Sequence, residues 1–216
     1  SMHRASSLTA IDAYGPHISE GINDKARNEF LCTSSTLYGG QRLVEDKTAI
    51  IHAIGLTAQD AWLASARGAS VIWSPRSNIS LYGHTAQTPL LAKVGVSIAL
   101  GTDWTASGSM NILRELQCAA DLNEKQYGNF FTDRDLWQMA TFNAALATAT
   151  NDVLGQLQVG LVGDVSIFIG TADRKEHKAV VRAGVEDVAL VLRGGIPMYG
   201  DAAVLEYTRR FDGVEA

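Results

Sequence analysis

Three residues that could bind a divalent metal lie where predicted strands end, and a fourth could carry protons. His17, with Glu20 three residues later, closes a short strand candidate over residues 13–19. His52 closes a nearly continuous apolar run over 48–53, and Asp103 follows another over 96–100. Neutral imidazole and carboxylate groups both suit zinc, and a spare glutamate is a suitable proton carrier. These residue types indicate a candidate metal site.

Each of these residues also has a structural interpretation that needs no metal. A single histidine at a strand end is more often hydrogen-bonded for structural reasons than it is a ligand. Glu20 could place negative charge near the N-terminus of the next helix, where the helix dipole favours it. Asp103 could be a turn or capping residue. Residue type and spacing alone leave both interpretations open.

The segments that would position these residues follow a repeated pattern of strand and then helix. The pattern predicts strands over 13–19, 48–53, 70–73 and 96–100, and helices over 25–30, 58–67, 89–94, 111–122 and 133–148. Asn23, Thr57 and Asp133 are the predicted N-caps, and Asp60 is a capping-box partner for Thr57. Apolar strands that alternate with helices predict a parallel sheet covered on both sides. Since the carboxyl ends of such strands meet at one edge, we expect the four candidate residues to cluster there.

The texture of the sequence changes after Gly155. Strand-like segments at 165–169, 188–193 and 197–199 are joined by glycine-rich turns, with little helix predicted between them. We therefore expect two parts, an α/β part over residues 1–154 and a small β-rich part over 155–216.

Composition argues against several classes of partner. The formal net charge is −5 and no run of lysine or arginine occurs, so nucleic acid and anionic membrane are not expected partners. No apolar run approaches the roughly 20 residues of a membrane span, and the first residues lack the apolar region of a signal peptide. Cys32 and Cys118 are isolated, which favours two buried or half-buried free thiols in a reducing compartment. We expect a cytoplasmic protein with a small-molecule substrate.

Seven short motifs follow one another along almost the whole chain. They are H-x-x-E at 17–20, a histidine in an apolar stretch and a helix cap at 50–57, P-x-S-N at 75–78, G-T-D at 101–103, the segments at 140–145 and 154–164, and R-G-G with Y-G-D at 193–201. In this order and at these spacings they resemble the amidohydrolase superfamily, in particular its branch of cytosine and guanine deaminases and triazine chlorohydrolases.

The resemblance implies a fold and an activity. Residues 1–154 would form the second half of a (β/α)8 TIM-type barrel, namely strands five to eight with their helices. Residues 155–216 would form the C-terminal part of a small β-sandwich domain. The activity implied is metal-dependent hydrolysis of a C–N bond, by deamination or by cleavage of an amide or amidine, in a small cyclic substrate.

The resemblance also implies a role for each candidate residue. His17 would bind the metal, which is zinc or another divalent ion such as iron. Asp103 would be a second ligand and would accept a proton from the attacking water. His52 would orient that water or polarise the substrate, and it is a third candidate ligand. Glu20 would carry the proton to the leaving nitrogen.

The sequence departs from the family pattern in one respect that bears on activity. The family anchors its metal with an H-x-H pair on barrel strand one, but the histidines here, at positions 3, 17, 52, 84 and 177, contain no such pair. Of these, His84 and His177 are predicted surface residues. Trp104 follows G-T-D where small residues are common, and it is expected to narrow the pocket.

The absent pair suggests a truncated chain that binds metal weakly or not at all. The alternative function is accordingly a folded, non-catalytic fragment that associates with itself or with a missing N-terminal half. A half barrel has two unpaired sheet edges, so we expect a homo-oligomer.

Overall fold

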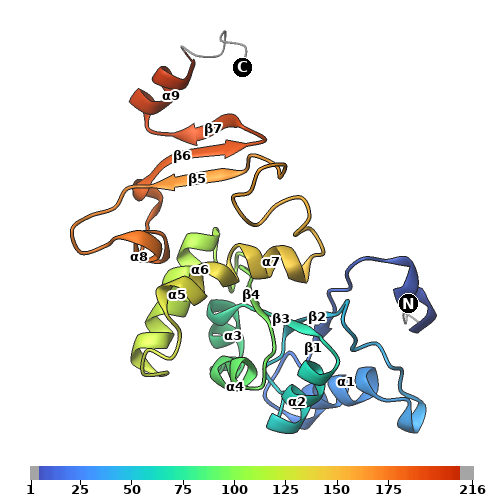
Figure 1. Cartoon of the computed structure of the whole chain (residues 1–216). Helices are drawn as coiled ribbons and strands as arrows, with labels where there is room; N and C mark the ends of the chain where they lie inside the picture. Colours follow the sequence, from blue (N-terminus) through green and yellow to red (C-terminus); the bar gives the residue numbers. More distant parts are fainter. Residues whose placement is uncertain (1–4, 210–216) are drawn as a thin grey trace.

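Four short parallel strands form the sheet that carries the candidate residues (Figure 1). They are β1 (His17–Ile18), β2 (Ala49–His52), β3 (Ser70–Trp73) and β4 (Ile98–Leu100), and they lie in the order β1-β2-β3-β4. This is a computed structural model, which describes residues 5–209. The register pairs Ile18 with His52 and Trp73 with Leu100, so the carboxyl ends of the strands meet at one edge. The predicted α/β fold with a parallel sheet is confirmed.

Helices connect the strands and cover the sheet. They are α1 (Asp24–Ser34), α2 (Ala58–Ala66), α3 (Pro75–Tyr82), α4 (Thr88–Lys93), α5 (Ile112–Lys125), α6 (Asp133–Met139) and α7 (Phe142–Ala147), with 3-10 turns η1 (Ala5–Ala10) and η2 (Leu37–Gly39). Two predicted caps are present. The Asn23 side chain accepts from the N–H of Ala26, and Thr57 forms a reciprocal capping box with Asp60.

The two faces of the sheet are covered unequally. On one face the buried side chains of Val71 and Trp73 pack in the main core with helix residues such as Leu91 and Leu116. The register places a second row on the other face: His17, Ile51, Ile72 and Ala99. Ile51 and Ile72 in that row are only half-buried. Ala144 and Ala147 of α7 pack against part of it, so this face is the less completely covered.

Two predictions for helices were wrong, and one helix was not predicted. The helix predicted over 133–148 is two helices, α6 and α7, because the Thr141 hydroxyl donates to the carbonyl of Trp137 and the backbone turns there. The N-cap of α6 is Thr132, which shares a capping box with Asp135, and Asp133 is its first helical residue. No helix was predicted at the P-x-S-N segment, which begins α3, where proline is well suited to the first turn of a helix.

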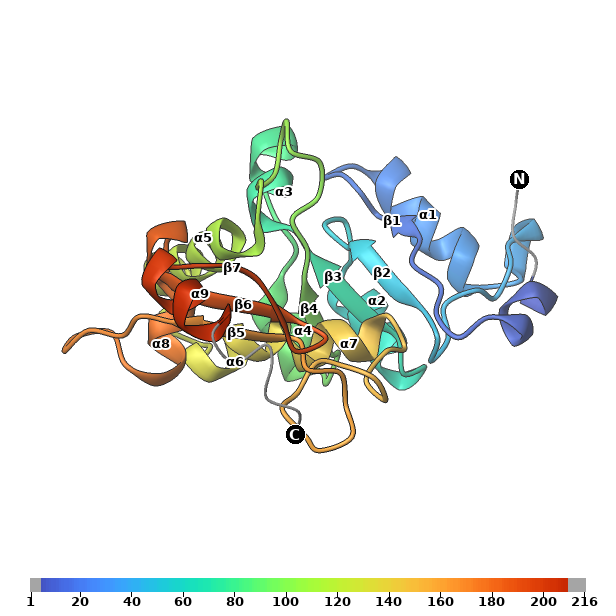
Figure 2. The same ribbon diagram turned by 90° about the horizontal axis from the view of Figure 1, so that it is seen from above.

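The C-terminal part contains a three-stranded antiparallel sheet. Its strands are β5 (Val165–Phe168), β6 (Val188–Arg193) and β7 (Ile196–Gly200), in that order. The prediction of little helix was wrong, because α8 (Glu176–Val181) and η3 (Val185–Asp187) lie between β5 and β6, and α9 (Ala202–Arg209) follows β7. Helix α8 was not predicted because its segment is rich in charged residues. Its buried Val181 nevertheless belongs to the main core. Figure 2 shows this sheet and α1 at opposite ends of the molecule.

Within residues 5–209, no helix is both long enough and apolar enough to cross a membrane. Cys32 and Cys118 are both free thiols. Cys118 is half-buried, but Cys32 is exposed, so the prediction of a buried or half-buried thiol was wrong for Cys32.

Candidate metal centre

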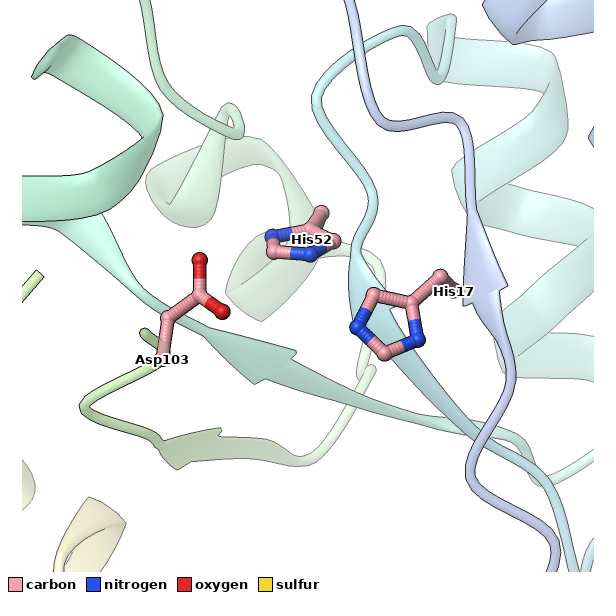
Figure 3. Close-up of side chains that lie close together, drawn as sticks. All are labelled: His17, His52 and Asp103. Atoms are coloured by element: carbon pink, nitrogen blue, oxygen red, sulfur yellow. The ribbon is translucent and has the colours of Figure 1, made fainter. Parts of the chain in front are cut away.

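Three side chains converge at the carboxyl edge of the parallel sheet (Figure 3). His17 comes from β1, His52 from the last position of β2, and Asp103 from the loop after β4. Each offers one ligand atom, and these atoms all lie within 4.8 Å of one another. The two imidazole rings have centroids 5.0 Å apart. The fold therefore brings together the three residues that the sequence singled out as candidate ligands.

The backbone at this edge adopts conformations that are uncommon for residues with a side chain. The φ angle is 79° at His52, 56° at Ala53, 56° at Asp103 and 57° at Ser19. A left-handed conformation at a non-glycine residue costs of order 1 to 3 kcal/mol, and such residues cluster at functional sites. Here they end the strand and turn the chain beside each candidate ligand. The surrounding packing must hold this strain in place.

The loop that presents Asp103 is folded tightly on itself. The N–H of Ser109 donates to the carbonyl of Thr102 at 3.0 Å. A Cβ atom at Gly108 would lie 2.0 Å from that same carbonyl oxygen, so the turn requires glycine there. The position of Asp103 thus depends on a residue five places later in the sequence.

The two ring nitrogens of His52 have different surroundings. Nδ1 lies 3.1 Å from the amide nitrogen of Asn78. Nε2 is buried, has no hydrogen-bond partner among the described residues, and lies 3.5 Å from Oε2 of Glu20. Burial lowers the pKa of the imidazole, and the negative charges of Glu20 and Asp103 oppose that shift. The result is a neutral histidine with one polar atom directed into the site.

Glu20, the proposed proton carrier, has a partner that the sequence did not identify. The hydroxyl of Tyr82, the last residue of α3, donates to Oε1 of Glu20 at 3.0 Å. Tyr82 lies four positions after Asn78 on this helix, so the two residues share one of its faces. A helix predicted over 75–82 would have placed both residues at the site. They were missed because the sequence analysis predicted no helix there.

A buried polar network fixes α3 against α5 and the loop after β4. The fully buried carboxylate of Glu115 accepts from the backbone N–H of Arg76 at 2.9 Å and from the hydroxyl of Ser109. The hydroxyls of Ser77 and Ser107 lie 2.8 Å apart. Burial raises the pKa of Glu115. This network ties the helix that carries Asn78 and Tyr82 to the loop that carries Asp103.

Other residues noted in the sequence lie away from this cluster. His84 is exposed beside Gln87, as predicted. His177 is half-buried with its ring 4.8 Å from that of Trp137, so the prediction of a surface residue was only partly right. Trp104 is 69% exposed next to Asp103. His3 lies outside the described residues.

The donor set fits a divalent metal. Imidazole nitrogen and carboxylate oxygen are ordinary zinc ligands, and the three candidate atoms are close enough to share one ion.

Comparison with known proteins identifies the family of this chain. The model of the amidohydrolase family matches residues 10–188. The chain belongs to the amidohydrolase family. Two deaminases of 5-methylthioadenosine and S-adenosylhomocysteine are among its relatives. The one from Teredinibacter turnerae is 36% identical over 126 residues, which are 57% of this chain and 28% of the relative. The one from Halobacterium salinarum is 29% identical over 175 residues, 76% of this chain and 40% of the relative.

Solved structures show the same fold for this amidohydrolase chain. An adenosine deaminase from Xanthomonas campestris with bound zinc gives a TM-score of 0.75 at 23% identity, covering 95% of this chain and 51% of that one. The guanine deaminase of E. coli gives a TM-score of 0.69 at 19% identity, and the match covers 86% of this chain and 47% of the deaminase. An atrazine chlorohydrolase from Arthrobacter aurescens, complexed with zinc, gives a TM-score of 0.69 at 17% identity, and the match covers 95% of this chain and 49% of the chlorohydrolase. The chain thus spans less than half of the two curated relatives and about half of these three structures.

Proposed function

We propose that this amidohydrolase chain contributes part of the active site of a metal-dependent hydrolase that cleaves a C–N bond. The observation that carries the proposal is the convergence of His17, His52 and Asp103 at one edge of a parallel sheet. In α/β barrels that edge is where the loops that hold catalytic residues meet. Glu20, a titratable group in contact with this cluster, adds a residue able to move a proton.

The substrate class follows from the relatives. One of the proteins named above is an atrazine chlorohydrolase. The others are deaminases of 5-methylthioadenosine and S-adenosylhomocysteine, of adenosine and of guanine. All of these substrates carry an amino group on a purine ring. We propose a small cyclic substrate of this kind, from which ammonia is released.

His17 and Asp103 would hold the metal, with His52 as a third candidate ligand. Zinc is the first ion to test, because two of the related structures contain it, and iron is an alternative. A divalent ion would act as a Lewis acid and would lower the pKa of a bound water. Asp103 is half-buried, so its carboxylate is accessible to molecules that enter the site.

Glu20 is suited to carry a proton between the attacking water and the leaving nitrogen. Its two oxygens have separate neighbours: Oε1 accepts from Tyr82, and Oε2 lies toward His52. The Tyr82 hydrogen bond holds the carboxylate in one orientation, which leaves Oε2 to take up and release the proton.

We also propose a division of the chain into parts. Residues 1–154 would be the second half of a (β/α)8 barrel, and residues 155–216 the C-terminal part of a small β-sandwich domain. The half-buried side chains of Ile51 and Ile72 support this proposal, since the interior face of a barrel is covered by its opposite strands.

A second candidate function is a folded, non-catalytic fragment. The sequence contains no H-x-H pair, and a catalytic zinc site usually has three protein ligands. If His52 is not a ligand, two remain. The chain would then need a further metal-binding segment, from the missing N-terminal half, before it could act as an enzyme.

Zinc titration by calorimetry of the chelator-treated protein tests the proposal. We expect weak zinc binding that is lost in His17→Ala and retained in His84→Ala, a matched change at an exposed histidine. Ammonia release from adenosine, guanine and 5-methylthioadenosine should be absent or slight with this chain alone. Binding that survives both His17→Ala and Asp103→Ala would refute the site. Tight stoichiometric zinc with rapid turnover would refute the need for a further segment.

A further inference from the structure

A chain of hydrogen bonds runs from β3 to the ring of His52. The indole Nε1 of Trp73 donates to Oγ1 of Thr85 at 2.7 Å. The Thr85 hydroxyl donates to Oδ1 of Asn78 at 3.2 Å, and the Asn78 amide nitrogen lies 3.1 Å from Nδ1 of His52. All four side chains are buried. A fully connected network in a buried place holds its members in fixed orientations.

The chemistry of the donor groups fixes the direction in which each hydrogen bond of this network is donated. An indole N–H can only donate, so the oxygen of Thr85 accepts and its own proton must go elsewhere. The other partner of that hydroxyl within the described residues is the carbonyl oxygen of Asn78. If the Asn78 amide were rotated by 180°, its NH2 group and the indole N–H of Trp73 would both face the oxygen of Thr85. The buried hydroxyl hydrogen of Thr85 would then have no acceptor, which is costly. The Asn78 amide nitrogen therefore faces His52 and donates to it.

We propose that Asn78, oriented by Thr85 and Trp73, is a positioning residue that holds His52 as the tautomer protonated at Nε2. A ring nitrogen that accepts a hydrogen bond carries no hydrogen, so the hydrogen of the neutral ring lies on the other nitrogen. Nε2 is the buried atom that has no partner within residues 5–209. The N–H is a donor at the carboxyl edge of the sheet, where Nε2 lies 3.5 Å from Oε2 of Glu20.

This tautomer separates the two roles that the sequence left open for His52. A nitrogen that bears a hydrogen has no lone pair in the ring plane with which to bind a metal. It can instead donate to an oxygen of the water or of the substrate as charge develops there. This consequence rests on the proposed function, because that oxygen belongs to the proposed reaction. Asn78 would thus act on the reaction through His52 without touching the substrate.

Nitrogen NMR tests the proposal on the metal-free protein. Long-range ¹H–¹⁵N correlation of the labelled chain near pH 7.5, with His52 assigned by its loss in His52→Gln, reports which ring nitrogen carries hydrogen. We expect hydrogen on Nε2 in the native chain. In Asn78→Asp the carboxylate can only accept, so a hydrogen should appear on Nδ1. In Thr85→Val the amide loses its orienting partner, and a mixture of tautomers should appear. Thr88→Val, a buried threonine outside the network, should leave the spectrum unchanged.

Two results would overturn the proposal: hydrogen on Nδ1 of His52 in the native chain, or a bare Nδ1 in Asn78→Asp. Circular dichroism reports whether each variant folds. If Asn78→Asp does not fold, the native and Thr85→Val spectra still decide, because an unaltered tautomer in Thr85→Val also contradicts the proposed orientation of the amide. The outcome of the zinc titration does not depend on the outcome of the NMR experiment. A chain that binds no zinc but responds as expected in NMR would keep the positioning role and lose the proposed function.

Discussion

The hydroxyl of Tyr82 lies 3.0 Å from Oε1 of Glu20, joining the end of α3 to the segment after β1. Burial raises the pKa of the Tyr82 phenol, and its hydrogen bond to Glu20 raises it further. The phenol therefore stays protonated, and remains a donor, well above neutral pH. This contact places one oxygen of Glu20 and leaves the other beside His52.

Replacement of Tyr82 by phenylalanine should lower the free energy of unfolding by about 1 to 2 kcal/mol. The hydrogen bond that is lost has a charged acceptor, and it is partly buried. Urea denaturation at pH 7.5 measures the change. Tyr199→Phe, at an exposed tyrosine of β7, is the matched control and should have little effect. Equal stability of the two variants would mean that the Tyr82 contact is not maintained in solution.

The fold could be predicted further from the sequence than the site could. Apolar runs and helix caps predicted all four parallel strands, because burial on both faces of a sheet leaves a continuous apolar signal. The same pattern placed His17, His52 and Asp103 near strand ends. Helix α3 was missed because its polar residues, Ser77 and Asn78, are buried by hydrogen bonds rather than by apolar contacts. Tyr82 was missed with it, since no periodicity marks a polar face that turns inward.

Glu115→Gln should flatten the pH dependence of stability. Burial raises the pKa of Glu115 in the folded state above its value in the unfolded chain. Its contribution to stability is therefore full below the unfolded pKa, roughly 4.3, and is lost as pH rises through the folded pKa. Glutamine has the same shape, can still accept from the Arg76 N–H, and does not titrate. The fall in the free energy of unfolding from pH 5 to pH 7.5 should be smaller in Glu115→Gln than in the native chain.

Urea denaturation at both pH values measures the effect of Glu115→Gln. Glu124→Gln is the control, because Glu124 lies at the surface, where it pairs with Arg182. The same pH dependence in the native chain and in Glu115→Gln would show that the buried carboxyl group does not titrate with a raised pKa.

Zinc should raise the melting temperature of the native chain but not that of Asp103→Asn. An ion that binds the folded state alone stabilises it by about 2.7 kcal/mol at 100 times its dissociation constant. For a chain of this length, each kcal/mol corresponds to a shift of roughly 2–4 °C. Asparagine keeps the size of Asp103 and removes its charge, so the shift should be lost. Asp152→Asn, at an exposed loop position, should keep it. A zinc-induced shift of equal size in Asp103→Asn would place the metal elsewhere.

The chain should self-associate through the face of the parallel sheet that carries Ile51 and Ile72. These side chains are only half-buried, although the register sets them in one row with His17 and Ala99. The edge at β4 is partly occupied, since the Asn143 amide donates to the carbonyl of Ile98 at 2.9 Å. The outer edge of β1 has no neighbouring strand within the described residues. Apolar side chains beside an unpaired strand favour pairing with a second copy.

Sedimentation equilibrium at low micromolar concentration tests this association. We expect a dimer or larger species for the native chain, and a shift toward monomer in Ile72→Lys, because a charge on the shared face would have to be desolvated in the assembly. Ile79→Lys introduces the same change at an exposed position of α3 and should leave the assembly intact. Urea denaturation of both variants separates weakened association from weakened folding. A native chain that sediments as a stable monomer would show that α7 and the surrounding loops cover this face sufficiently on their own.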